Sequence, residues 1–387
     1  MEPTTTGTRS RSCSGSRLLV LCCLLLLTLV RSAVGVDQNN VLFKEVGSSG
    51  IITLNRPKLL NALNVSMVQQ IHAKLKEWES TKNTVIIKGS GDVAFSAGGD
   101  IKATILALEQ PYGEQEGFVY YRHFFSLGHL IGTYKKPYVA LMNGITMGGG
   151  AGISVLGKYR IATEKTLFAM PETAIGGFTD SGGSYFLSRL NDQLGMYLGL
   201  TGHRLKGIDV LLAGLATHYV HSDKLEDVTQ ELLANNNTNI DGILQPYSPR
   251  NIKQEFSLTP HLSLINSCFS APTVEEIINR LETSNSEWAS QVVKTLNKMS
   301  PTSLKISKKV IEEARSKSLA ECLIMEYRVF YNLFSKKCDF VEGVRALLID
   351  RDQNPSWNPK ALKDVSNAFI EQKFAPLPPQ DELQLEK

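Results

Sequence analysis

Short apolar runs alternate with segments of helical periodicity through the first half of the chain, and this alternation limits the folds open to it. Strands are predicted over runs of four to six residues at 41–46, 51–54, 85–88, 137–142, 159–162 and 166–169. Residues 66–81 instead carry Met67, Ile71, Leu75 and Trp78 along one helical stripe. Strands that alternate with helices favour an α/β fold on a mostly parallel sheet.

The second half of the chain is predicted to be mainly helical. Helices are expected over residues 194–200, 207–213, 223–234 and 273–283, and helical spacing continues to residue 334. Between them, residues 235–272 contain an asparagine-rich run and three prolines, which predicts an irregular surface connection. The tail, residues 374–387, is rich in proline and acidic residues, and we expect it to be frayed.

The first 36 residues are expected to be a cleavable targeting leader rather than part of the fold. Arginines precede an apolar run at 18–30, and the small residues Ala33-Val34-Gly35 follow at a spacing suited to cleavage. This layout is typical of a secretory signal peptide, because a run of 13 residues is short for a bilayer span. The arginine- and serine-rich opening also suits an organelle transit peptide. The leader itself leaves both destinations open.

Composition argues against several classes of protein. The formal net charge is +3 and no long basic run occurs, so nucleic acid is a poor candidate partner. The seven histidines form no HExxH motif and the six cysteines no CxxC motif, so no metal site is predicted. Only Cys268, Cys322 and Cys338 remain after leader removal, an odd and sparse set that argues against secretion.

Two carboxylates and two glycine turns form the candidate site. Residues 168–189 place Glu172 and Asp180 eight positions apart in a glycine-rich segment. Upstream, Gly98-Gly99-Asp100 and Gly148-Gly149-Gly150 can each present a backbone N–H, because glycine permits close approach and unusual dihedral angles. Two N–H groups aimed at a developing oxyanion stabilise it by about 3 kcal/mol each. Together, these parts suffice to cleave a thioester.

Each part also has a purely structural interpretation. Either glycine turn can simply be a tight turn, and Glu172 can be a solvated loop acid. Asp180 or Ser181 can serve only as the N-cap of the following helix. Glu172, however, follows Met170-Pro171, which keeps its backbone out of a helix and on a rigid corner. A carboxylate held in this way suits a general base or a nucleophile.

Motifs spread over residues 41–362 carry a resemblance to a known family. They are Ile52-Thr53-Leu54-Asn55-Arg56-Pro57, Leu60-Asn61-Ala62-Leu63, residues 94–102, Lys136-Pro137-Tyr138, Gly144-Ile145-Thr146-Met147, and residues 168–176, 299–305, 339–346 and 355–357. With them the chain resembles the crotonase, or enoyl-CoA hydratase/isomerase, superfamily. Its carboxyl-terminal motifs are similar to those of the branch that hydrolyses 3-hydroxyisobutyryl-CoA.

The resemblance implies an architecture. It implies an α/β fold with a crotonase-like spiral of ββα units over residues 37–200, after the leader at 1–36. A helical carboxyl-terminal region over 201–373 and the tail at 374–387 would follow. Family members often assemble into homo-oligomers, so self-association is a possibility, and no membrane anchor is expected once the leader is removed.

The resemblance also implies site roles and an activity. Gly99 and Gly149 would form the oxyanion hole, with Glu172 the catalytic glutamate and Asp180 its partner. The expected reaction is hydrolysis of a short, branched hydroxyacyl-CoA thioester, 3-hydroxyisobutyryl-CoA from valine breakdown. The acyl-CoA is the partner, and because CoA is part of the substrate no separate cofactor and no metal are expected.

The same resemblance also implies, more weakly, a role for two lysines, and it favours one destination for the leader. Lys58 and Lys102 match positions that some relatives use near the CoA phosphates. The CoA substrate favours the mitochondrial matrix as the destination of the leader, with the secretory pathway as the alternative.

Some positions depart from the family pattern. Hydratases carry a second glutamate where this chain has Gly152, which favours hydrolysis over the alternative, an enoyl-CoA hydratase or isomerase. The hydrolase branch has adjacent glutamates where His123 and Phe124 stand here. The loop after Glu172 differs from that branch at three positions, Gly177, Thr179 and Ser181. We expect the glycine at 177 and the loss of proline at 179 to loosen the segment that carries Asp180. The departures at residues 123, 124, 177, 179 and 181 together keep open a non-catalytic acyl-CoA-binding relative.

Overall fold

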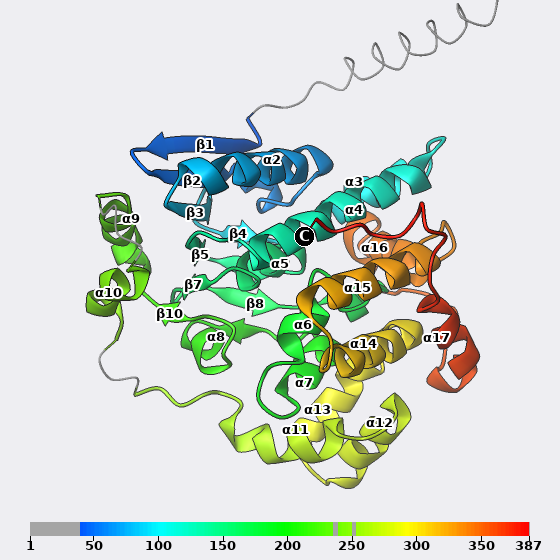
Figure 1. Ribbon diagram of the computed structural model, residues 1–387. Helices are drawn as coiled ribbons and strands as arrows, with labels where there is room; N and C mark the ends of the chain where they lie inside the picture. Colours follow the sequence, from blue (N-terminus) through cyan, green and yellow to red (C-terminus); the bar gives the residue numbers. More distant parts are fainter. Residues whose placement is uncertain (1–38, 235–238, 250–252, 387) are drawn as a thin grey trace, which may run out of the picture. The chain divides into compact units, whose positions relative to one another are not determined.

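The computed structural model describes residues 39–234, 239–249 and 253–386 (Figure 1). Its fold is built on two sheets, and the chain contributes strands to each of them in turn. The larger sheet has the order β1 (Val41–Val46), β2 (Ser49–Leu54), β3 (Thr84–Gly89), β5 (Tyr138–Met142), β7 (Tyr159–Ala162) and β10 (His218–Tyr219). β1 and β2 pair antiparallel as a hairpin, and every later neighbour pairs parallel. The expected leader lies outside the described residues.

The strands of a smaller sheet alternate along the chain with strands of the larger one. Its order is β4 (Ala94–Ser96), β6 (Ile145–Met147), β8 (Leu167–Ala169) and β9 (Leu205–Lys206). Because β4 follows β3, β6 follows β5 and β8 follows β7, each turn of the chain adds one strand to each sheet before the next helical segment. This repeated path confirms the predicted α/β fold with mostly parallel pairing.

Helices of the first half follow these strand pairs. They are α2 (Val65–Thr81), α3 (Ile101–Ala107), α4 (Gly113–Gly132), α5 (Gly149–Val155), α6 (Gly183–Leu187), α7 (Leu194–Thr201) and α8 (Ile208–Leu212). α2 begins where the Asn64 side chain accepts the N–H of Met67, a standard N-cap. Its stripe of Met67, Ile71, Leu75 and Trp78 is fully buried, which confirms the helical period predicted there.

The second half is helical, as predicted. Its helices are α9 (Leu225–Ala234), α10 (Ile240–Leu244), α11 (Leu262–Phe269), α12 (Val274–Thr283), α13 (Glu287–Leu296), α14 (Pro301–Ala314), α15 (Leu319–Leu333), α16 (Asp339–Val344) and α17 (Asn367–Lys373). The prediction of an irregular connection over 235–272 is wrong where α10 and α11 form. Each is short, but Ile265, Cys268 and Phe269 recur at helical spacing and are buried, so packing stabilises α11 despite the nearby proline.

The carboxyl-terminal tail, expected to be frayed, packs against helices over its described residues. Leu377 and Leu383 are buried. Arg122 of α4 donates to the carbonyl oxygens of Asp381 and Glu382, and the Glu382 carboxylate accepts from Arg328 of α15 at 2.8 Å. The two buried leucines and the three polar contacts hold this segment in place despite its high proline content. The boundaries proposed at 36/37, 200/201 and 373/374 remain predictions.

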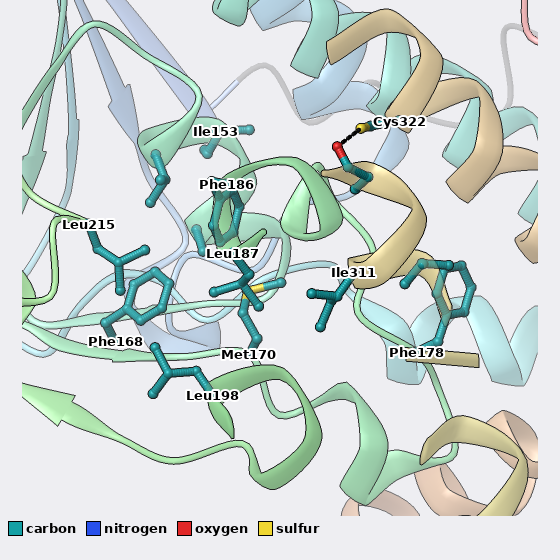
Figure 2. Packing of buried hydrophobic residues seen from close by; sticks show 14 of the residues in the cluster. Ile153, Phe168, Met170, Phe178, Phe186, Leu187, Leu198, Leu215, Ile311 and Cys322 are labelled. Atoms are coloured by element: carbon teal, nitrogen blue, oxygen red, sulfur yellow. Dashed lines mark hydrogen bonds between the residues drawn. The ribbon is translucent and has the colours of Figure 1, made fainter. Parts of the chain in front are cut away.

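A hydrophobic core joins the smaller sheet to the helices that follow it. Figure 2 shows Phe168 and Met170, at the end of β8, facing Phe186 and Leu187 of α6. Leu198 of α7 and Ile311 of α14 close the same cluster, and at its edge the Cys322 thiol donates to the Ala314 carbonyl oxygen at 3.9 Å. The core therefore holds both ends of the segment that carries Glu172 and Asp180.

The described residues contain neither a membrane-spanning helix nor a cluster of metal ligands. No helix among them has the length and apolar character needed to cross a bilayer. Within the same residues, no three or more histidine, cysteine, aspartate or glutamate side chains gather closely enough to hold a metal ion.

Candidate active site

The two glycine turns predicted to supply N–H groups touch each other. Gly98 has φ +106°, and a Cβ placed on it would lie 3.2 Å from the Gly149 nitrogen. A Cβ placed on Gly149 would lie 3.3 Å from the Gly99 nitrogen. Across the described ranges, neither the Gly99 nor the Gly149 N–H donates to another residue. The fold therefore brings two free backbone donors together at one place, at the ends of β4 and β6.

Glu172 lies directly beside these turns. It begins a 3₁₀ turn, Glu172–Ile175, immediately after Pro171. Its Oε1 is 2.9 Å from the point that a Cβ on Gly148 would occupy, and Gly148 has φ +50°, a conformation that favours glycine. The residue is 8% exposed, and its Oε2 is buried with no hydrogen-bond partner among the described residues. This carboxylate is not a solvated loop acid.

Asp180 shares the same electrostatic environment. It opens a corner, residues 180–184, in which Ser181 has φ +62° and donates its hydroxyl to Asp180 Oδ1 at 2.9 Å. Burial raises the pKa of Asp180 to about 7, against the lowering effect of the Ser181 hydrogen bond. Burial and then the charge of Asp180 raise the pKa of Glu172 well above its ordinary range. The two carboxyl groups therefore interact.

A third buried carboxylate, Glu326 of α15, supports this corner. It accepts the N–H groups of Gly182 at 2.7 Å and Ser184 at 3.0 Å, and it also accepts the Ser184 hydroxyl. Glu326 thus satisfies the first N–H groups of α6, so neither Asp180 nor Ser181 serves as the N-cap. Burial raises the pKa of Glu326 to about 8, against the opposing hydrogen bond from Ser184.

All four predicted site residues line one cavity of about 490 Å³, which we call the main cavity. Its wall also includes Lys58, Leu59, Leu60, Ala62, Ala97, Gly98, Asp100, Ile101, Lys102, Tyr120, Tyr121, Phe124, Gly148, Pro171, Ile175, Gly177, Phe178, Ser181, Phe330, Leu333, Phe334, Cys338, Phe340, Leu348 and Arg351. Aromatic rings dominate its inner wall. Three basic side chains, those of Lys58, Lys102 and Arg351, belong to the same lining. The arrangement suits a ligand with a reactive carbonyl, an apolar end and an anionic end.

Comparison with known proteins identifies the family. A family model described as enoyl-CoA hydratase/isomerase matches residues 49–374. The chain belongs to the enoyl-CoA hydratase/isomerase family. This finding confirms the crotonase-like fold expected from the sequence.

Relatives within the family agree over most of their length. The chain is 49% identical over 350 residues to the mitochondrial 3-hydroxyisobutyryl-CoA hydrolase of Gallus gallus, covering 87% of this chain and 89% of the relative. It is 49% identical over 349 residues to the protein of the same name from Homo sapiens, with the same coverage. Among solved structures, a carnitinyl-CoA dehydratase from Mycobacterium thermoresistibile superposes with a TM-score of 0.82 at 34% identity, covering 90% of this chain and 99% of that one.

Gly152, where family hydratases were expected to carry a second glutamate, is closed to a side chain. A Cβ there would lie 2.6 Å from the Ser181 carbonyl oxygen and 3.4 Å from the Phe124 ring. The corner that carries Asp180 therefore occupies the space in which a second glutamate would have to stand. The site therefore has an acid at Asp180 and none at Gly152. This geometry favours hydrolysis over the addition of water to a double bond.

The two positions on α4 that depart from the family pattern, His123 and Phe124, lie in different surroundings. Phe124 is 3% exposed and lines the main cavity, with a ring carbon 3.1 Å from the point a Cβ on Gly149 would occupy. His123 lies outside the main-cavity lining and pairs with Gln69 of α2 at 3.0 Å. Of the two substitutions, only Phe124 changes the wall of the site.

The loop after Glu172 is held more firmly than its sequence suggests. The Thr179 N–H donates to the Ser307 hydroxyl of α14 at 3.0 Å, a hydrogen bond that a proline at this position cannot make. Gly177 makes only ordinary contacts, with a Cβ position 3.4 Å from the Glu172 carbonyl oxygen. The loosening expected from residues 177 and 179 is therefore opposed by a tertiary bond.

Several residues of the site escaped the sequence analysis. Glu326, Phe330 and Phe334 come from α15 or its end, and Tyr120 and Tyr121 from α4. One signal was present for Glu326, a glutamate on the otherwise apolar stripe of a predicted helix. Nothing in the local pattern distinguishes cavity aromatics from ordinary core aromatics, because both are buried.

Proposed function

We propose that this chain hydrolyses 3-hydroxyisobutyryl-CoA to 3-hydroxyisobutyrate and CoA. The hydrolases of chicken and human that share about half of its residues carry this activity in their names. The observation on which the proposal rests is the buried Glu172 carboxylate beside the free N–H groups of Gly99 and Gly149. These groups supply what thioester cleavage requires, a carboxylate at the acyl carbon and donors for the oxygen.

The reaction follows from where charge develops. The acyl oxygen gains negative charge when the carbonyl carbon is attacked, and the N–H groups of Gly99 and Gly149 stabilise it. Glu172 either attacks that carbon to form a mixed anhydride, which water then opens, or removes a proton from an attacking water. In both routes the carbon–sulfur bond breaks, a carbon–oxygen bond to water forms, and the sulfur leaves as a thiol after gaining one proton.

Asp180 is proposed as the partner of Glu172. Because burial raises its pKa to about 7, Asp180 carries a proton in a substantial fraction of molecules at neutral pH. It can therefore deliver a proton to the leaving thiolate, or as a carboxylate accept a hydrogen bond from a hydroxyl on the acyl chain. The bond from Ser181 favours the ionised form and fixes the direction of the side chain.

The CoA portion is proposed to extend along the basic part of the main cavity. Lys58 and Lys102, matched on sequence, and Arg351, found in the structure, line it together. No salt bridge engages these three cations within the described residues. Free cations of this kind suit the phosphates of CoA.

A thiol-release assay across a panel of acyl-CoAs tests the proposed activity. We expect 3-hydroxyisobutyryl-CoA to be hydrolysed with the highest kcat/KM, and crotonyl-CoA to show no loss of its enoyl absorbance. Absence of thiol release from 3-hydroxyisobutyryl-CoA, or rapid hydration of crotonyl-CoA, would overturn it. A single turnover in ¹⁸O-water separates the two routes, because only nucleophilic attack leaves label in Glu172.

We propose the mitochondrial matrix as the destination, because the relatives are named as mitochondrial proteins. A carboxyl-terminal fluorescent tag imaged in cells tests it against the secretory pathway. Self-association into a homo-oligomer also stays a proposal, which light scattering of the purified chain would decide.

A further inference from the structure

Two neighbouring tyrosines on α4 bring unpartnered hydroxyl groups to the main cavity. Tyr120 and Tyr121 are 5% and 6% exposed, and both belong to the cavity wall with Glu172 and Asp180. Neither hydroxyl forms a hydrogen bond with any residue that the structure describes. Both rings are buried, but neither hydroxyl oxygen is among the buried, unpartnered side-chain atoms of the described residues, so both hydroxyls are open to the cavity. In a binding cavity, such a group indicates a polar atom of the ligand.

The two hydroxyls serve different parts of the cavity. Tyr120 Oη lies 2.7 Å from the point a Cβ on Gly99 would occupy, beside one of the two glycine turns. After burial, the charges of Asp180, Tyr120 and Glu172 raise the pKa of Tyr121, whereas Glu172 has no such effect on Tyr120. Tyr121 therefore shares the main cavity with both carboxylates and is influenced by the charge of each, whereas the Tyr120 hydroxyl lies at the Gly99 turn.

The Tyr121 ring is held rigidly. It stacks on Phe330 of α15 with ring centroids 3.6 Å apart and meets the Tyr120 ring edge-on at 5.1 Å. A ring packed on two sides presents its hydroxyl at a fixed position, so little side-chain entropy is lost when that hydroxyl binds a ligand. Phe124, one turn further along α4, offers only an apolar ring to the same cavity.

We infer that Tyr121 recognises the hydroxyl group of the acyl chain, donating its O–H to that oxygen while the Asp180 carboxylate accepts the substrate's O–H. One donor and one acceptor in the same cavity match the hydrogen-bonding capacity of a single alcohol. Phe124 and Phe178 then pack the branched hydrocarbon. This inference rests on the proposed function and deepens it, because it names the group that selects a hydroxylated acyl-CoA over its unhydroxylated analogue.

Paired substrates test the inference. Initial rates of thiol release are measured for 3-hydroxyisobutyryl-CoA and for isobutyryl-CoA, which lacks only the hydroxyl, using wild type, Tyr121→Phe and the matched control Tyr120→Phe. We expect Tyr121→Phe to lower kcat/KM for the hydroxylated substrate by roughly tenfold or more and to change that for isobutyryl-CoA by less than about threefold. Tyr120→Phe should leave the ratio of the two kcat/KM values unchanged.

Stability provides an independent measurement. Because Tyr121→Phe removes a cavity-facing hydroxyl that has no protein partner, no protein hydrogen bond is lost, and its melting temperature should equal or exceed that of wild type. Equal losses on both substrates, an unchanged ratio, or a ratio altered by Tyr120→Phe instead of Tyr121→Phe would each overturn the inference while leaving the hydrolase activity intact. Wild type that releases thiol from neither substrate would reject the proposed function itself, and the inference with it.

Discussion

At the scale of single residues, the buried Glu172 carboxylate lowers the free energy of unfolding, because one of its oxygens has no hydrogen-bond partner among the described residues. A carboxylate that is 8% exposed and has one oxygen without a partner is destabilising in the absence of substrate. The nearby Asp180 charge adds to this cost. Such cost is common where a group is kept for chemistry rather than for stability.

Replacing Glu172 separates chemistry from stability. We expect Glu172→Gln to lower kcat by several orders of magnitude, because an amide is neither a base nor a nucleophile at this position. Acyl-CoA binding should persist, since the N–H groups of Gly99 and Gly149 and the basic residues remain. The same change removes a buried charge and should raise the free energy of unfolding by about 1–2 kcal/mol. Turnover and calorimetry test both, and a variant with wild-type rate would refute the role of Glu172.

The raised pKa values predict an unusual pH profile. Both shifts favour the protonated carboxylic acids, so the ionised form of Glu172 is lost as pH falls through a value well above 4.5. We expect log kcat/KM to fall on the acid side at a pH well above 4.5, because burial and the charge of Asp180 raise the pKa of Glu172. An acid limb below pH 5 would contradict the coupling. In Asp180→Asn, the remaining step should shift to lower pH, because the neighbouring charge is gone.

At the scale of elements, α15 acts on the site through α6. Glu326 stands 144 residues from Gly182 and holds the N–H groups of the 180–184 corner with both of its oxygens. The same helix supplies Phe330 to the main cavity. A helix of only five residues, α6, needs this external acceptor, because its own first turn offers no side-chain cap.

Loss of one oxygen at Glu326 should loosen the corner. Glu326→Gln replaces one acceptor by an amide NH₂, which leaves the N–H of Gly182 or Ser184 unpaired at a cost of about 1–3 kcal/mol. We expect lower kcat with little change in KM, since Asp180 loses its fixed position but CoA contacts persist. Glu321→Gln on the same helix is the control, because glutamine also completes its capping box with Ser318. Equal effects of the two variants would exclude the positioning role.

At the scale of the whole molecule, the carboxyl-terminal tail connects the two helices that line the site. α4 and α15 lie side by side (Figure 1), and the tail bonds to Arg122 on the first and Arg328 on the second. Leu377 and Leu383 anchor it to the core. The segment therefore stabilises the position of Tyr121 relative to Glu326.

Shortening the chain tests this connection. Removal of residues 376–387 should lower the free energy of unfolding by about 3 kcal/mol or more, because two leucines leave the core at about 1.5–3 kcal/mol each. Activity should fall with it. Removal of residues 386–387 is the control, since within the described part of the chain Glu386 forms an exposed pair with Lys76 that contributes about 0–1 kcal/mol. Equal melting temperatures for the long truncation and wild type would show that the tail is dispensable.

Local sequence was sufficient for much of the fold. The buried stripe of α2 and the parallel strands β3, β5 and β7 follow from periodicity alone. The prediction of an irregular 235–272 segment and of a frayed tail failed for one reason. In both, prolines dominated the local signal, while stability came from leucine, isoleucine and phenylalanine side chains packed against distant helices.

Local sequence is enough to predict the order of strands and helices, the glycines that permit two close turns, and Glu172 and Asp180 as candidate acids. Those properties depend on backbone sterics and on residue chemistry, which act over a few neighbouring positions. Tertiary packing alone brings Glu326 to the corner, closes the space at Gly152 with Ser181, and places Tyr121 in one cavity with both carboxylates. These depend on which side chains from remote segments share one buried, low-dielectric space, and packing of the whole chain sets that.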